Sequence, residues 1–83
     1  MADGDISITL SRDQAIVLSD WLDRRMVSAE FAAVVDDRAA WSPLLRIAGS
    51  LETQLVEIFQ DSYGQRLDEA RARLIPLLGD FGA

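Results

Sequence analysis

The sequence of 83 residues contains no histidine, cysteine, lysine or asparagine. Without histidine and cysteine, the chain cannot build a zinc site of the usual ligand types, a thiol nucleophile, a Ser-His-Asp triad or a disulfide framework. It also has no Gly-rich phosphate loop and no calcium-loop spacing such as D-x-D-x-D-G. We therefore expect no metal, no cofactor and no enzymatic activity.

Positive charge is also scarce. The 8 basic residues are all arginine, and 14 acidic residues outnumber them to give a formal net charge of −6. Such a balance repels phosphate backbones and anionic lipid, so we expect neither nucleic acid nor a membrane as partner. No apolar run approaches the roughly 20 residues of a membrane span, and acids stand where a signal peptide would carry positive charge. We expect a cytoplasmic protein whose acidic surface suits a basic protein partner.

Apolar residues make up 49% of the chain, which indicates one small domain with a thin stability margin. Their spacing predicts a mainly α fold, a three-helix arrangement with one short N-terminal β-strand. The strand covers about residues 5–10, and the helices about residues 12–27, 37–59 and 62–76. Residues 1–4 and 79–83 are expected to fray.

The strand prediction rests on the alternation Ile6-Ser7-Ile8-Thr9-Leu10. A lone strand leaves its backbone donors and acceptors unpaired, so it needs a second strand or must lie along the helices as an extended arm. Two partners are open: the apolar segment 31–35 and residues 6–10 of a second subunit. Ser11 and Gln14 have the spacing of a capping box for the helix that follows.

Two stretches of the predicted helices are less defined. Residues 29–36 suit a helix, a strand or a loop. Pro43 either lies at the start of a fresh helix capped by Ser42 or falls within one longer helix from about residue 37, which we favour. That longer helix carries a wide apolar face and is the expected central core helix. Its apolar residues are Trp41, Leu44, Leu45, Ala48, Leu51, Leu55, Val56, Ile58 and Phe59.

A few residues break the apolar pattern of the helices. Glu52 falls in the middle of the wide face, and Arg25 lies inside the apolar stripe of the first helix, whereas Ile16 falls on its polar side. Because a buried carboxylate is costly without a partner, we expect Glu52 to form a buried polar pair with Arg25 or another arginine, or to accept hydrogen bonds from the end of the strand, and so to fix helix register. The alternative is Glu52 as a general base, for which no second carboxylate is securely identified.

The two tryptophans, Trp21 and Trp41, are expected to anchor the core. Trp21 lies at the margin of its stripe beside Asp20 and Asp23. Tryptophan is common among interface hot spots. We therefore predict that Trp21, Asp20 and Asp23 contact a partner.

Two segments carry a resemblance to a known family. The sequence from Leu10 to Leu22 fits L-[ST]-x-[DE]-[EQ]-A-x-V-L-x-x-W-L, and that from Leu51 to Phe59 fits L-E-x-x-L-V-E-x-F. The chain thus resembles a family of short, mostly uncharacterised bacterial proteins that are frequent in actinobacteria, over most of residues 6–74. The resemblance implies that Glu52 and Glu57 matter beyond solubility, so Glu57 joins the predicted partner-binding residues.

The sequence favours a non-enzymatic, acidic protein-protein interaction module. Small acidic domains of this kind can act as immunity proteins or antitoxins that mask a basic partner. The alternative is a homo-oligomeric structural or regulatory protein, a homodimer that pairs through its N-terminal strand. A small enzyme that uses Glu52 comes third.

Overall fold

A computed structural model describes residues 4–82. The predicted fraying of residues 1–3 and 83 lies outside the described residues, and residues 79–82 form turns. The fold is mainly helical, as predicted. Its α-helices are α1 (Arg12–Arg25), α2 (Ala29–Val34), α3 (Trp41–Gln54) and α4 (Tyr63–Leu74). Short 3-10 turns are η1 (Arg38–Ala40), η2 (Val56–Phe59) and η3 (Ile75–Leu78).

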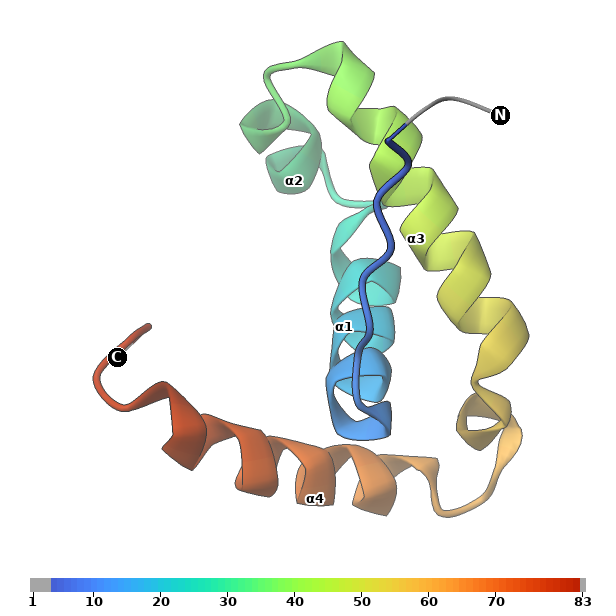
Figure 1. The fold of residues 1–83 in the computed structure, drawn as a ribbon, viewed down its shortest axis with the longest axis vertical. Helices are drawn as coiled ribbons and strands as arrows, with labels where there is room; N and C mark the ends of the chain where they lie inside the picture. The colour runs from blue at the N-terminus through green and yellow to red at the C-terminus, as the bar shows by residue number, and fades with distance from the viewer. Residues whose placement is uncertain (1–3, 83) are drawn as a thin grey trace.

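Helix α1 is the central element of the fold. Figure 1 shows α3 running along one side of α1 and α4 crossing it, and α1 contacts both helices. A core cluster of Ile16, Leu67 and Ala70 joins α1 to α4. The expectation that the helix around residue 50 is central is therefore wrong, since α3 has no buried residue. Ile16 is buried because α1 is covered on two sides rather than along one stripe.

The start of α1 confirms the predicted capping box. The Ser11 hydroxyl oxygen accepts a hydrogen bond from the Gln14 backbone N–H at 3.0 Å, and the Gln14 Oε1 accepts one from the Ser11 N–H at 2.9 Å. A second cap follows α1, where the Ser28 Oγ accepts from the Phe31 N–H at 3.1 Å. Residues 29–36, which suit a helix, a strand or a loop by sequence, therefore begin as the short helix α2.

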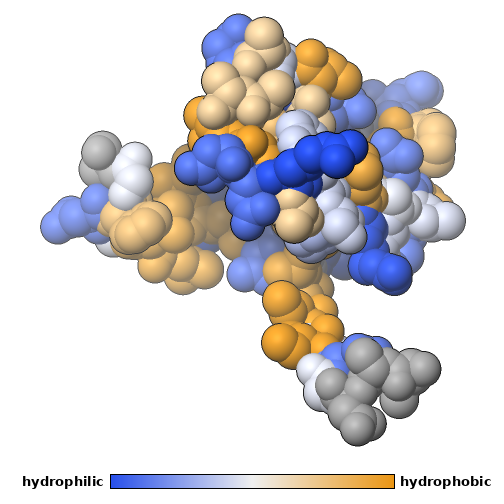
Figure 2. All heavy atoms as spheres, turned by 90° about the horizontal axis from the view of Figure 1, so that it is seen from above, coloured by the Kyte–Doolittle hydropathy of each residue, from blue (hydrophilic) through white to orange (hydrophobic). Residues whose placement is uncertain are grey.

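The predicted N-terminal β-strand is not seen in the described part of the single chain. No strand is present in residues 4–82, and residues 5–10 form an exposed segment outside any regular element. The reason is that the in-chain candidate partner, residues 31–35, is drawn into α2 by the Ser28 cap. Figure 2 shows hydrophobic residues projecting from the body on a narrow extension. We call residues 5–10 the N-terminal arm.

The predicted helix over residues 37–59 is interrupted. After η1, α3 ends at Gln54, Leu55 takes an extended conformation (φ −101°, ψ 96°), and the chain re-forms a helical turn in η2. The break lets the Leu55 side chain become buried, with 2% of its surface exposed. Pro43 lies in the first turn of α3, where its missing N–H costs no helical hydrogen bond. The last predicted helix ends as an α-helix at Leu74 and continues as η3, which contains Pro76.

The fold covers its apolar residues incompletely. Only five hydrophobic residues in the described part of the chain are buried, namely Ile16, Leu22, Leu55, Leu67 and Ala70. The accessible surface is 6662 Å², whereas a compact monomer of 9.2 kDa is expected to expose about 4,900 Å². Large hydrophobic side chains lie on this surface, among them Val27, Phe59 and Phe81, which expose 88%, 82% and 81% of their surface.

We predict that replacing Ser11 by alanine destabilises the fold by about 1 kcal/mol, because α1 loses the hydroxyl that satisfies a backbone N–H. Ser62→Ala is the matched control, since Ser62 precedes α4 without making a capping hydrogen bond. Urea denaturation of both variants measures the difference. Equal stability of Ser11→Ala and Ser62→Ala would contradict the role of the cap.

Candidate functional site

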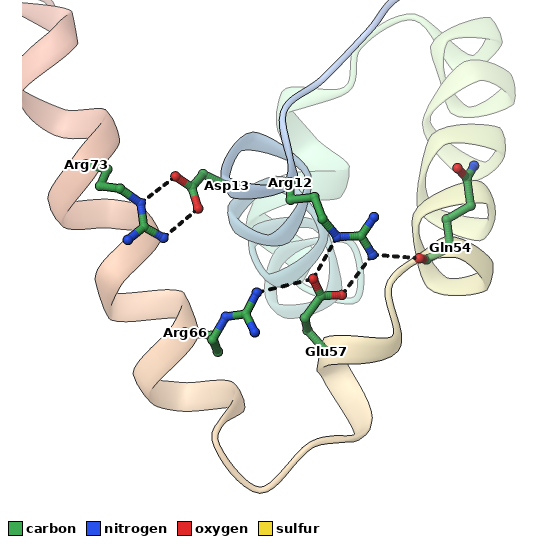
Figure 3. Close-up of polar contacts among 6 residues, drawn as sticks. All are labelled: Arg12, Asp13, Gln54, Glu57, Arg66 and Arg73. Atoms are coloured by element: carbon green, nitrogen blue, oxygen red, sulfur yellow. Dashed lines mark hydrogen bonds and ion pairs between the residues drawn. The ribbon is translucent and has the colours of Figure 1, made fainter.

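Glu57 is the buried carboxylate of the fold. The turn η2 directs it against the start of α1, and 4% of the residue is exposed. The Arg12 guanidinium holds it with two hydrogen bonds, from Nε to Oε2 at 2.8 Å and from Nη2 to Oε1 at 3.1 Å (Figure 3). The same Nη2 donates to the Gln54 carbonyl oxygen at 3.2 Å. One arginine thus fastens η2 and the end of α3 to α1.

A second arginine completes the surroundings of Glu57. The Arg66 Nη2 lies 3.5 Å from Oε2 and brings α4 to the same carboxylate (Figure 3). The hydrogen bond from Arg12, the Glu57 backbone N–H and the two guanidinium charges lower the pKa of Glu57 to about 2. Its negative charge also offsets the unfavourable placement of Arg12 at the positive N-terminal end of α1. Glu57 is therefore ionised at neutral pH and has a structural role.

Two more ion pairs close the contact between α1 and α4. Asp13 accepts two hydrogen bonds from Arg73, at 2.6 and 2.7 Å, and the hydrogen bond from Arg73 lowers the pKa of Asp13 (Figure 3). Further along α1, Asp20 lies 3.2 Å from the Arg71 Nη2. Tyr63 donates its hydroxyl to Asp20 at 3.3 Å, and burial together with the Asp20 charge raises the Tyr63 pKa.

Two of the predicted partner-binding residues, Asp20 and Glu57, form ion pairs with arginines of the same chain. Asp20 is held by Arg71 and, at 2.8 Å, by Arg24, while Glu57 is buried. Arg24 follows Asp20 at the local i,i+4 spacing, but Arg71 lies 51 residues from Asp20 and Arg12 lies 45 residues from Glu57, and no local pattern marks these two distant pairs. Both carboxylates thus have a structural role within the chain, and their contact with a partner stays a prediction.

The aromatic residues form a line between α1, α2 and α3. Phe31 contacts Trp21 on one side and Trp41 on the other, each edge-on with ring centroids 5.6 Å apart. Trp41 is half-buried, whereas Trp21 leaves 42% of its surface exposed. Both tryptophans thus help to hold α2 in place. A contact between the exposed part of Trp21 and a partner stays a prediction.

The expected buried pair of Glu52 and Arg25 is not formed. Glu52 is exposed, and none of the ion pairs within residues 4–82 includes Glu52 or Arg25. Glu52 lies in the uninterrupted part of α3, which has no buried residue on any side. Because α3 flanks α1 instead of forming the centre of the fold, Glu52 stays exposed and lines a groove between the two helices.

Glu52 and Asp23 meet at a groove between α1 and α3. The groove has a volume of about 330 Å³ and a largely apolar lining. It is lined by Ser19, Leu22, Asp23, Met26, Val27, Leu45, Ala48, Gly49 and Glu52. Both carboxylates are exposed, and within the described chain neither forms an ion pair. We call this the acidic groove.

Comparison with protein-family models, with curated proteins and with solved structures finds no match to this chain. The resemblance to short actinobacterial proteins therefore stays a prediction, as does the cytoplasmic location. Over residues 4–82, no helix combines the length and hydrophobicity needed to cross a membrane. Within the same range, no three acidic side chains gather in a way that could hold a metal ion.

We predict that Glu57→Gln destabilises the fold by about 1.5–3 kcal/mol, because the amide keeps the shape of the side chain but loses the charge-assisted hydrogen bonds from Arg12. Glu52→Gln removes the same charge at an exposed position and serves as control. Chemical denaturation at neutral pH compares the two. A larger effect of Glu52→Gln would contradict this assignment.

The lowered pKa of Glu57 also predicts a pH dependence. The ordinary value is 4.5 and the folded value about 2, so the ionised carboxylate stabilises the fold above pH 4.5. That contribution is lost as the pH falls from 4.5 towards 2, because the unfolded chain binds the proton first. Thermal unfolding of wild type and Glu57→Gln should therefore differ less at the acidic end of this range. A constant difference would show that Glu57 does not titrate in this way.

Proposed function

We propose that the protein is a non-enzymatic interaction module whose acidic groove binds a basic, partly apolar segment of another protein. The observation that carries this proposal is the placement of Asp23 and Glu52 on the walls of one apolar groove, exposed and without an intrachain cation in the described residues. A partner would supply the missing positive charge.

The contrast with the other carboxylates of α1 and η2 supports this role. Asp13, Asp20 and Glu57 are each held by an arginine and stabilise the fold. Within residues 4–82, the two acids of the groove take part in none of the ion pairs, so their charge is available for recognition. An arginine of a partner could donate two parallel hydrogen bonds to either carboxylate. The net charge of −6 would also speed the approach of a basic protein.

The floor of the groove adds an apolar component to the proposed binding. Val27 and Leu45 expose 88% and 60% of their surface, so a partner that covers them removes apolar area from water. Met26 lies beside them, and its flexible side chain can adapt to different apolar groups. The partner segment that fits best is an amphipathic one with arginine or lysine beside its apolar residues.

The proposed class of function is that of an immunity protein or antitoxin, which neutralises a basic partner by covering its surface. A general-base role for Glu52 has less support. Glu52 is exposed, and no hydrogen bond within residues 4–82 orients its carboxylate, whereas a catalytic group needs a fixed position.

The test is a capture experiment with matched charge variants. The wild type, Asp23→Lys/Glu52→Lys and the control Glu30→Lys/Asp61→Lys are each tagged and offered the same extract. Both double variants change the net charge equally, but Glu30 and Asp61 are exposed residues outside the groove.

We expect a basic protein that binds the wild type and the control and is lost from the groove variant. When this basic protein is purified, the dissociation constant of its complex with the groove variant should be at least about 100-fold higher than that of its complex with the wild type, because two charge pairs are lost. A partner retained by the groove variant, or lost equally from both variants, would contradict the proposal.

A further inference from the structure

The N-terminal arm forms one wall of a second groove. This groove has a volume of about 460 Å³ and a mainly apolar lining. It is lined by Ile6, Ile8, Leu10, Arg12, Ala15, Leu18, Arg46, Ile47, Ser50, Leu51, Gln54 and Leu55. The arm contributes the three apolar members of its alternating sequence, so these side chains share one face. Even so, Ile6 and Ile8 leave 86% and 79% of their surface exposed.

The backbone of the arm lacks hydrogen-bonding partners. Within the described chain, no backbone hydrogen bond joins residues 5–10 to another segment. An exposed apolar segment with free backbone donors and acceptors is a template for pairing with another strand. The apolar-polar alternation of residues 6–10 suits that role, because it gives the paired strand one apolar and one polar face.

The protein exposes more surface than a compact monomer of its mass, and the apolar residues Ile6 and Ile8 of the arm are part of that exposed surface. Its accessible surface of 6662 Å² exceeds the value for a compact monomer by roughly 1,700 Å². A standard interface takes about 800 Å² from each partner. The excess therefore exceeds what one protomer contributes to a stable dimer.

We propose that the N-terminal arms of two copies pair as an antiparallel two-stranded ribbon across a two-fold axis. With Ile8 opposite Ile8 of the second copy, Ile6 lies opposite Leu10 of that copy, and all six apolar side chains share one face. A two-fold axis perpendicular to the ribbon leaves that face turned towards the bodies of both protomers. The ribbon then covers the second groove of each copy, while Ser7 and Thr9 face solvent.

The arm suits a copy of itself better than a basic partner. Residues 6–10 carry no charge, although 27% of the chain is charged, so the paired arms bring no like charges opposite each other. The residue types also match across the two-fold axis, because apolar positions meet apolar ones and Ser7 meets Thr9. The acidic groove does not include the arm, so this dimer is independent of the proposed function.

Sedimentation of the full chain at several concentrations tests the proposal. The wild type should sediment as a dimer. Ile8→Asp should raise the dimer dissociation constant at least about 100-fold, since it places two carboxylates opposite each other on the apolar face. Thr9→Asp, on the solvent face, should remain a dimer. A monomeric wild type, or a dimer unaffected by Ile8→Asp, would overturn the proposal.

A disulfide provides a second readout that does not depend on a destabilising charge. The chain has no cysteine, so Ile8→Cys introduces a single thiol that meets its own copy at the centre of the ribbon. Mild oxidation should link this variant into covalent dimers. Ser7→Cys, which is offset from its copy, should link far less. Equal linking of the two variants, or none in Ile8→Cys, would overturn the proposed register.

Discussion

The pairing of buried Glu57 with Arg12 is the interaction on which the rest of the structure depends. Arg12 begins α1, its guanidinium also binds the carbonyl oxygen at the end of α3, and Arg66 adds α4 to the same carboxylate. The helices α1, α3 and α4 share few buried apolar residues, so the contacts of Glu57 and its two arginines join all three. Because both arginines are partly exposed, the pair keeps much of its hydration, which limits the desolvation cost of burying Glu57.

The two flanks of α1 differ in how they are closed. Towards α4, an apolar cluster and the pairs Asp13–Arg73 and Asp20–Arg71 complete the contact. Towards α3, the helices leave the acidic groove on one part of the contact and the arm groove on another. The α1–α4 side is therefore the stable scaffold, and the α3 side presents the surfaces that we assign to recognition. Because α3 buries none of its residues, the core is small and the side of α1 that faces α3 stays open.

Local sequence signals predicted the elements that depend on neighbouring residues. The capping box of Ser11 and Gln14 fixes the start of α1, and the spacing of apolar residues predicts α4; the structure confirms both helices to within a few residues. The break at Leu55 could not be predicted this way, because contacts with α1 set it. That break changes the helical phase of the residues that follow it, so Glu57 turns inwards. The N-terminal strand is not seen in the described single chain for a similar reason, since strand pairing depends on a partner that the local sequence does not specify.

The central claim, that Glu57 is an ionised carboxylate held by arginine, can be measured directly by following the NMR shift of its side-chain carboxyl carbon during acid titration. The arrangement of Arg12 and Arg66 predicts a midpoint near the folded pKa of about 2. A midpoint near the ordinary value of 4.5 would contradict the claim, because it would show that no arginine stabilises the ionised form.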